Sequence, residues 1–110
     1  MDINHAVIAL SALSQETRLR VFKLLIEYGM DGAPAGQLSE QLDIPQNTLS
    51  FHLSHLSHAG LVKSRRSGRS IIYSANNEAA QSLLAFLVEN CCVRDKSNKC
   101  CPPKKKGKPL

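Results

Sequence analysis

The chain has 110 residues, of which 43% are hydrophobic, and a formal net charge of +5. A chain of this length has room for one compact domain, because a second independent core would need roughly another 50 residues. No stretch approaches the roughly 18 consecutive apolar residues of a membrane span, so we expect no membrane partner. The first residues carry the acidic Asp2 where a signal peptide would be basic, which favours a cytoplasmic location.

The charge is unevenly distributed. Residues 1–93 hold seven Lys/Arg and eight Asp/Glu, a net of −1, whereas residues 94–110 hold seven Lys/Arg and one Asp, a net of +6. We therefore predict a folded domain over residues 1–93 and a basic, Cys/Lys/Pro-rich tail over residues 94–110 that is flexible without a ligand. A better indicator of nucleic-acid binding than the net charge is a local basic cluster. It consists of Lys63, Arg65, Arg66 and Arg69.

The first part of the chain predicts three helices. Apolar residues recur at helical spacing over Ile3–Leu13, and Ser14 is a suitable N-cap for a second helix, Gln15–Tyr28. Glycines and a proline interrupt the pattern over residues 29–34, and a short third helix is expected at Ala35–Leu42. The side chains of the second helix expected to face inward are Leu19, Phe22, Leu25 and Ile26.

A fourth helix follows after the tight connection Asp43-Ile44-Pro45. Pro45 suits its first turn, the helix should end near Ala59-Gly60, and leucines at positions 49, 53 and 56 give it a narrow buried stripe. Two short helices joined by such a turn are typical of a helix-turn-helix, whose second helix lies in the DNA major groove. The exposed face of this helix offers polar groups suited to base edges and phosphates. They are Gln46, Asn47, Thr48, Ser50, His52 and His55.

The last part of the chain predicts a β-hairpin and a fifth helix. Leu61–Arg66 and Ser70–Ala75 are rich in strand-forming residues, and Ser67-Gly68 between them suits a two-residue turn. Asn77 can cap a helix from Glu78 to about Asn90, with more apolar residues than one small core needs. This surplus indicates a dimer interface. The predicted fold is mainly α with a β-hairpin wing, a winged helix-turn-helix that dimerises through its first and last helices.

Several motifs together make the sequence resemble the ArsR/SmtB family of metal-responsive repressors over about residues 6–88. They are LSQETRLR at 13–20, QNTLSFHL at 46–53, AGLV at 59–62, and RSGR at 66–69 with Tyr73. The resemblance implies a homodimer built on the first and last helices, whose two recognition helices read half-sites about one helical turn apart. It also implies repression that is relieved by an inducer. Because the sequence shows no catalytic motif, we expect no enzymatic activity.

Two sensing sites well known in that family are missing from this sequence. Residues 36–41, before the recognition helix, contain no cysteine, where members often carry a Cys-x-Cys site. Residues 79–90 contain no His or Asp, where other members bind zinc on the last helix. In addition, Phe51 occupies a position where the family often has a basic or polar residue.

The cysteines indicate where an inducer could bind. Their clustering favours a binding or redox role, and thiolates without His or carboxylate partners select soft ions. Adjacent cysteines do not match structural zinc spacing, and a reducing cytosol disfavours a disulfide framework. Trivalent arsenic or antimony favours three sulfur ligands, which two cysteines of the first pair and one of the second could supply, with nearby basic residues favouring the thiolates. The candidate ligands are Cys91, Cys92, Cys100 and Cys101.

The sequence thus predicts a dimeric repressor that binds operator DNA without a cofactor and is released by As(III) or Sb(III). Three alternatives stay open. Paired thiols can instead oxidise or react with persulfides, giving a redox-sensing repressor of the same fold. The regulator could be constitutive, or the chain could be an enzyme acting on thiols or arsenicals, although the sequence shows no catalytic motif.

Overall fold

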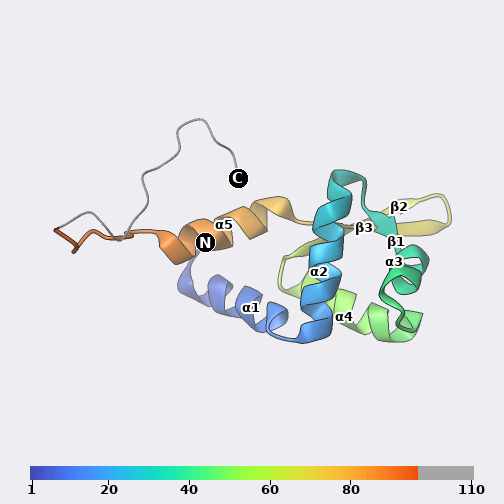
Figure 1. The fold of residues 1–110 in the computed structure, drawn as a ribbon. Coiled ribbons are helices and arrows are strands. Elements are labelled where there is room, and N and C mark those ends of the chain that lie inside the picture. The colour runs from blue at the N-terminus through green and yellow to red at the C-terminus, as the bar shows by residue number, and fades with distance from the viewer. Residues whose placement is uncertain (97–110) are drawn as a thin grey trace.

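The computed structural model describes residues 1–96, which form a mainly helical domain with a small antiparallel sheet (Figure 1). The predicted winged helix-turn-helix fold is confirmed. Its elements are α1 (Ile3–Leu13), α2 (Glu16–Tyr28), the 3-10 turn η1 (Gly29–Asp31), β1 (Ala33–Pro34), α3 (Ala35–Leu42), α4 (Gln46–His58), β2 (Val62–Ser67), β3 (Ser70–Ala75) and α5 (Asn77–Val88).

Helix boundaries differ from the sequence prediction where a neighbouring side chain provides the cap. Gln15, and not Ser14, caps α2, because the Gln15 side-chain oxygen accepts a hydrogen bond from the Arg18 amide at 2.8 Å. The hydroxyl of Ser14 donates instead to the Ser11 carbonyl at the end of α1. Asn76, and not Asn77, caps α5, so this helix begins one residue earlier than predicted. Helix ends are set by these local hydrogen bonds, which periodicity does not reveal.

The sheet has the strand order β1-β3-β2, with both pairs antiparallel. Ser67 pairs with Ser70, so the two-residue turn of the wing is Gly68-Arg69 and the predicted turn was wrong by one residue. Gly68 has a φ of +63°, the conformation that a type II′ turn requires at its first central position. Strand β1 was not predicted, because two residues are too few for a periodic pattern.

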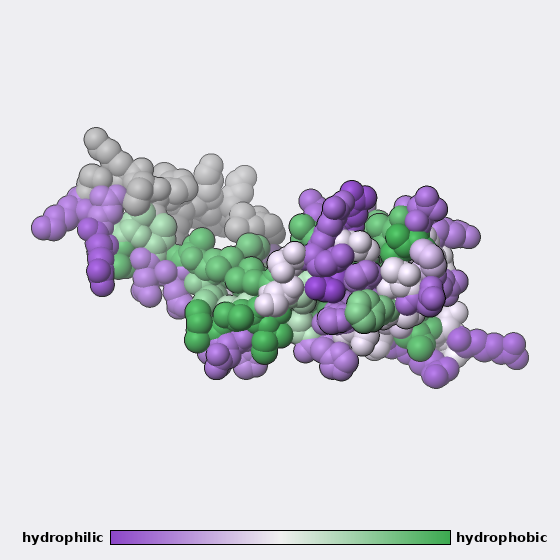
Figure 2. Space-filling view, turned by 90° about the horizontal axis from the view of Figure 1, so that it is seen from below, coloured by the Kyte–Doolittle hydropathy of each residue, from purple (hydrophilic) through white to green (hydrophobic). Residues whose placement is uncertain are grey.

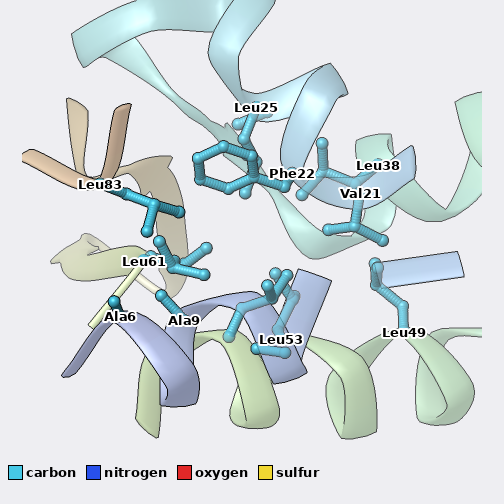
Figure 3. Close-up of a cluster of buried hydrophobic side chains, with 14 residues drawn as sticks. Ala6, Ala9, Val21, Phe22, Leu25, Leu38, Leu49, Leu53, Leu61 and Leu83 are labelled. Carbon is cyan, nitrogen blue, oxygen red and sulfur yellow. The ribbon is translucent and has the colours of Figure 1, made fainter. Parts of the chain in front are cut away.

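The core lies where α2, α3 and α4 meet the base of the sheet (Figure 3). The predicted stripe of α4, Leu49, Leu53 and Leu56, is fully buried. On α2 the prediction was half wrong, since Leu19 and Ile26 are 43% and 42% exposed. Helix α2 packs against both α4 and β3, and the residues that it buries between them are Val21, Phe22 and Leu25.

Helices α1 and α5 lie together at the end of the molecule away from the wing (Figure 1). Helix α1 buries three alanines and α5 buries only Leu83. Both helices leave larger apolar side chains exposed. These side chains form a patch that gathers in the middle of the view in Figure 2, and we call it the α1–α5 patch. It comprises Ile3, Val7, Ile8, Leu10, Leu84, Leu87 and Val88. Among residues 1–96, no helix is long and apolar enough to cross a bilayer.

Candidate nucleic-acid interface

Helix α4 packs one face inward and turns a polar face outward. Its buried residues stand at i, i+3, i+4 and i+7, which is the spacing of one helix face. The structure leaves exposed five of the six polar residues that the sequence assigned to this helix, although Gln46, seven residues before Leu53, lies at the N-terminal end of the buried face beside Gly36 of α3. The five exposed residues are Gln46, Asn47, Thr48, Ser50 and His55. All five side chains are therefore accessible to a DNA duplex, as far as the described part of the chain is concerned.

His52 is the exception, because its side chain is only 8% exposed. The expectation that it lies on the exposed face is wrong, since residue 52 is one turn from Leu49 and Leu56 and points to the same side of the helix. Its Nδ1 atom is buried without a hydrogen-bond partner. Burial lowers the pKa of His52, and the positive charges of Arg18 and His55 lower it further, so the folded protein favours the neutral ring. His52 therefore belongs to the packing of α4.

The N-terminus of α4 offers backbone donors on the same side. Pro45 precedes the helix in an extended conformation, and no side chain caps it there. The Asn47 side-chain oxygen accepts from the Thr48 amide at 2.9 Å, which covers one first-turn amide. The amides of Gln46 and Asn47 have no hydrogen-bond acceptor within the helix, because the N–H groups in the first turn of any helix lack one. Such amides suit a DNA phosphate.

The basic cluster of the wing divides into two sides, because successive residues of a strand point to opposite faces. Arg65 is exposed, but its guanidinium donates to the backbone carbonyls of Met30, at 3.4 Å, and Asp31, at 3.0 Å. It therefore ties the wing to η1. Arg66 points to the other face and Arg69 lies in the turn, and neither forms an ion pair with the carboxylates of residues 1–96. Both remain available for phosphate.

The first cysteine pair lies beyond the end of α5. The helix ends at Val88, before the predicted end near Asn90, and Glu89 is extended, so the cysteines do not continue the helix. The Cys91 amide donates to the Val88 carbonyl at 3.0 Å, and the Cys91 and Cys92 Sγ atoms are 3.4 Å apart. Neither is a free cysteine: both are disulfide-bonded, which differs from the expectation that a reducing cytosol disfavours disulfides. Asn90 and Cys92 have φ values of +63° and +62°, so the chain turns sharply here.

The remaining predicted ligands, Cys100 and Cys101, and most of the predicted tail at 94–110 lie outside the described residues. Within residues 1–96, no three His, Cys, Asp or Glu side chains gather as a metal site. A third sulfur ligand for an ion held by Cys91 and Cys92 would therefore come from another part of the chain.

Known proteins share this arrangement of helix-turn-helix and wing. Residues 13–65 match a family model described as a helix-turn-helix domain. The HTH-type transcriptional regulator YgaV of Escherichia coli (strain K12) is 32% identical over 87 residues, which cover 79% of this chain and 86% of that protein. The structure of an ArsR-like transcriptional regulator from Rhodococcus sp. RHA1 matches with a TM-score of 0.70 at 27% identity, over 83% of this chain and 82% of the other. The chain belongs to the ArsR/SmtB family.

A further ArsR/SmtB-like relative is the transcriptional activator HlyU of Vibrio cholerae, which is 29% identical over 79% of this chain and 78% of that protein. Its structure matches with a TM-score of 0.64 over 84% of this chain and 99% of the other, and that of reduced HlyU with 0.62 over 81% and 90%. These relatives are all transcription regulators. This ArsR/SmtB protein is accordingly a DNA-binding transcription regulator and not an enzyme, as predicted.

Proposed function

We propose that the protein is a cytoplasmic, dimeric repressor that leaves its operator when As(III), or Sb(III), binds the C-terminal cysteine thiolates. The observation that carries this proposal is the position of Cys91 and Cys92. They are adjacent in the chain and lie directly beyond α5, the helix whose large apolar side chains are left exposed. A ligand at this pair would act on the end of a helix that joins the two subunits.

The dimer is supported by the α1–α5 patch. Large apolar side chains such as Leu84, Leu87 and Val88 are 53%, 53% and 64% exposed in one protomer, whereas a monomer of this size would gain stability by covering them. A second copy packed on the same patch gives a twofold axis. Such a dimer would present one α4 helix from each protomer, as the reading of two half-sites about 34 Å apart requires.

The DNA contacts are divided between the two features of the interface. The exposed polar residues of α4 are short enough to reach base edges, so they supply sequence preference. Arg66 and Arg69 of the wing, and the first-turn amides of α4, would bind phosphates and fix the position of the domain on the duplex. Residues 1–93 carry almost no net charge, so these few cations dominate the attraction to DNA.

Two adjacent cysteines can bind one soft ion once both are reduced. Both are disulfide-bonded in this structure, so the 3.4 Å between their sulfur atoms belongs to the oxidised chain and is not the geometry of a thiolate site. A third thiolate from Cys100 or Cys101 would complete a pyramidal site of the kind that trivalent arsenic favours. The binding form is the reduced protein, in which the ligands are thiolates.

Release of DNA requires that the ion bind the DNA-incompetent dimer more tightly than the competent one. Lowering operator affinity a hundredfold takes about 2.7 kcal/mol of such coupling. The turn over residues 89–92 contains two residues in the left-handed conformation, one of which is Cys92. A non-glycine residue in that conformation costs about 1–2 kcal/mol, so an ion that fixes or relieves it acts on energies of the required size.

A redox switch is the second candidate, and two observations favour it. Neither of the described cysteines is free, and reduced HlyU has been treated as a state of its own in a relative with the same fold. The Cys91 and Cys92 sulfurs are too far apart, at 3.4 Å, to be bonded to each other, because a disulfide measures about 2.05 Å. Oxidation would convert two thiols to a disulfide and pass two electrons and two protons to an oxidant such as peroxide.

The two candidates are separated by operator release from protein that is fully reduced, freed of reductant and kept under nitrogen. Fluorescence anisotropy of a labelled operator duplex is measured with arsenite, antimonite, cadmium, zinc or peroxide. Release by arsenite or antimonite at equimolar amounts, with no change in thiol oxidation state, supports the proposal. Release by peroxide alone, reversed by dithiothreitol, supports the redox switch. Binding that none of these compounds changes would show a constitutive regulator.

A further inference from the structure

Phe51 is a large aromatic side chain that stays exposed in the middle of α4. It is 58% exposed, whereas Phe22 of the core is 8% exposed. It is not one of the residues of the α1–α5 patch, although its ring neighbour His55 lines a surface hollow together with Val7 and Ile8 of that patch. From the sequence, Phe51 is noted only as a departure from the basic or polar residue that the family often has at this position.

The ring lies on the outward face of α4. At 3.6 residues per turn, residue 51 points roughly opposite to the buried stripe of Leu49, Leu53 and Leu56. Asn47 precedes it by four residues and therefore occupies the same face, one turn nearer the N-terminus of the helix. The N-terminal turns of a recognition helix are those that approach the base edges most closely. Phe51 thus stands beside the polar residues that face DNA.

Two histidines hold the ring in place. The rings of Phe51 and His55 make an edge contact with centroids 4.6 Å apart, and those of Phe51 and the buried His52 make another at 5.5 Å. Edge-to-face contacts at these distances are favourable for aromatic rings. Since His52 is fixed by the packing of α4, the ring of Phe51 presents an apolar surface in a defined position before any ligand binds.

We propose that Phe51 is a specificity residue that recognises thymine in each half-site through the C5-methyl group. In the major groove, this methyl is the apolar group that distinguishes a thymine edge from the other three bases, and aromatic side chains contact it there. Contact would remove the exposed ring and the methyl from water together. This inference rests on the proposed binding of DNA by α4, and it adds the identity of one base that the helix reads.

The size of the effect follows from one methyl group. Transfer of a methyl out of water corresponds to about fourfold in affinity, so a dimer that reads one thymine in each half-site loses about 16-fold when both methyls are removed. Replacing thymine by uracil, as deoxyuridine in the duplex, removes the C5-methyl group and leaves the base pairing and the hydrogen-bonding groups unchanged. The substitution therefore isolates the proposed contact.

The experiment begins by selecting binding sites from a pool of random duplexes with the full-length reduced protein. Each thymine pair of the selected site is then replaced by deoxyuracil, and affinity is measured for wild type, Phe51→Ala, Phe51→Leu and Arg66→Ala. We expect one symmetric pair of thymines whose replacement weakens wild type about 16-fold. Phe51→Ala should bind both duplexes equally, Phe51→Leu should keep part of the preference, and Arg66→Ala should bind more weakly with the preference intact.

The inference is overturned if wild type binds every deoxyuracil duplex as tightly as the thymine duplex, or if Phe51→Ala keeps the full preference. Either result leaves the proposed function standing, because the protein still selects a site. If wild type selects no sequence at all, the proposed function and the inference fail together. Since Phe51 is mostly exposed, we expect its variants to unfold at the same urea concentration as wild type, which shows that lost preference is not lost structure.

Discussion

Replacing Arg65 and Arg66 one at a time separates a structural arginine from a DNA-binding one. The Arg65 guanidinium donates to two carbonyls of η1, at 3.0 and 3.4 Å, whereas Arg66 points to the other face of β2. A hydrogen bond from a charged group contributes about 1.5–3 kcal/mol in general, but here both are exposed and one is long. We therefore expect Arg65→Ala to lower the free energy of unfolding by about 1 kcal/mol, and Arg66→Ala to leave it unchanged.

DNA binding should show the reverse order. Each phosphate contact contributes about 0.9 to the slope of log affinity against log salt concentration, so a dimer of Arg66→Ala loses about 1.8 from the slope. Between 50 and 200 mM salt, this loss corresponds to roughly a 12-fold smaller fall in affinity than for wild type. Arg65→Ala should keep the wild-type slope. Urea unfolding and anisotropy over a salt series measure the two quantities.

A charge control is available in Arg20→Ala, because Arg20 belongs to α2, outside α4 and the wing, and pairs with Glu16. It should change neither the salt slope nor, by more than a few tenths of a kcal/mol, the stability. The assignment of Arg65 to stability and Arg66 to DNA binding is refuted if Arg65→Ala lowers the salt slope as much as Arg66→Ala does. It is equally refuted if Arg65→Ala is as stable as wild type.

Three further predictions test the dimer, the sheet and the buried histidine. Leu84→Glu should sediment as a folded monomer that no longer binds a palindromic site, because it places a charge in the α1–α5 patch. Gly32→Ala should lower the free energy of unfolding, measured in urea, by at least about 2 kcal/mol. Gly32 has a φ of +68°, and an added Cβ would lie 2.2 Å from the Tyr73 carbonyl oxygen. Lowering the pH from 7.5 towards 5 should destabilise wild type more than His52→Gln. The folded pKa of His52 lies below its usual 6.5, so below that pH the unfolded chain binds the proton more readily and stability falls.

Matched variants make each of these results decisive. Ser82→Glu adds the same charge to the polar side of α5 and should stay dimeric; a dimeric Leu84→Glu would place the interface elsewhere. Gly60→Ala has a similar φ of +80° but open space around the added Cβ, so it should cost less than Gly32→Ala. A His52→Gln variant with the same pH dependence as wild type would show that folding does not lower the pKa of His52.

The helices and the buried stripe of α4 could be predicted because apolar residues repeat at helical spacing over several turns. His52 could not be placed by its chemical type, which reads as a polar surface residue, although its position between Leu49 and Leu56 is that of a core residue. The role of Arg65 depends on the carbonyls of η1, more than 30 residues away in the chain, and no local pattern reveals such a contact. Strand β1 and the register of the wing turn likewise depend on pairing with β3.

The large apolar residues of α1 repeat at helical spacing but do not face the core of their own domain. Ile3, Val7 and Leu10 repeat at helical spacing and predicted the helix correctly, yet they are 63%, 53% and 40% exposed. The residues that α1 turns to its own core are Ala6, Ala9 and Ala12, which allow the helix to pack closely. The stronger apolar stripe of this helix therefore faces away from its own domain, which periodicity alone does not distinguish from a core-facing stripe.

The most direct test of the proposed switch is an arsenite titration of the operator complex formed by the reduced wild type and by the double variant Cys91→Ser, Cys92→Ser. Both proteins should bind the operator with the same affinity in the absence of arsenite, because residues 91 and 92 lie outside the DNA-facing elements. Arsenite should lower wild-type affinity about a hundredfold and leave the double variant bound. A double-serine variant that arsenite still releases, or a wild type that it does not release, would contradict the account.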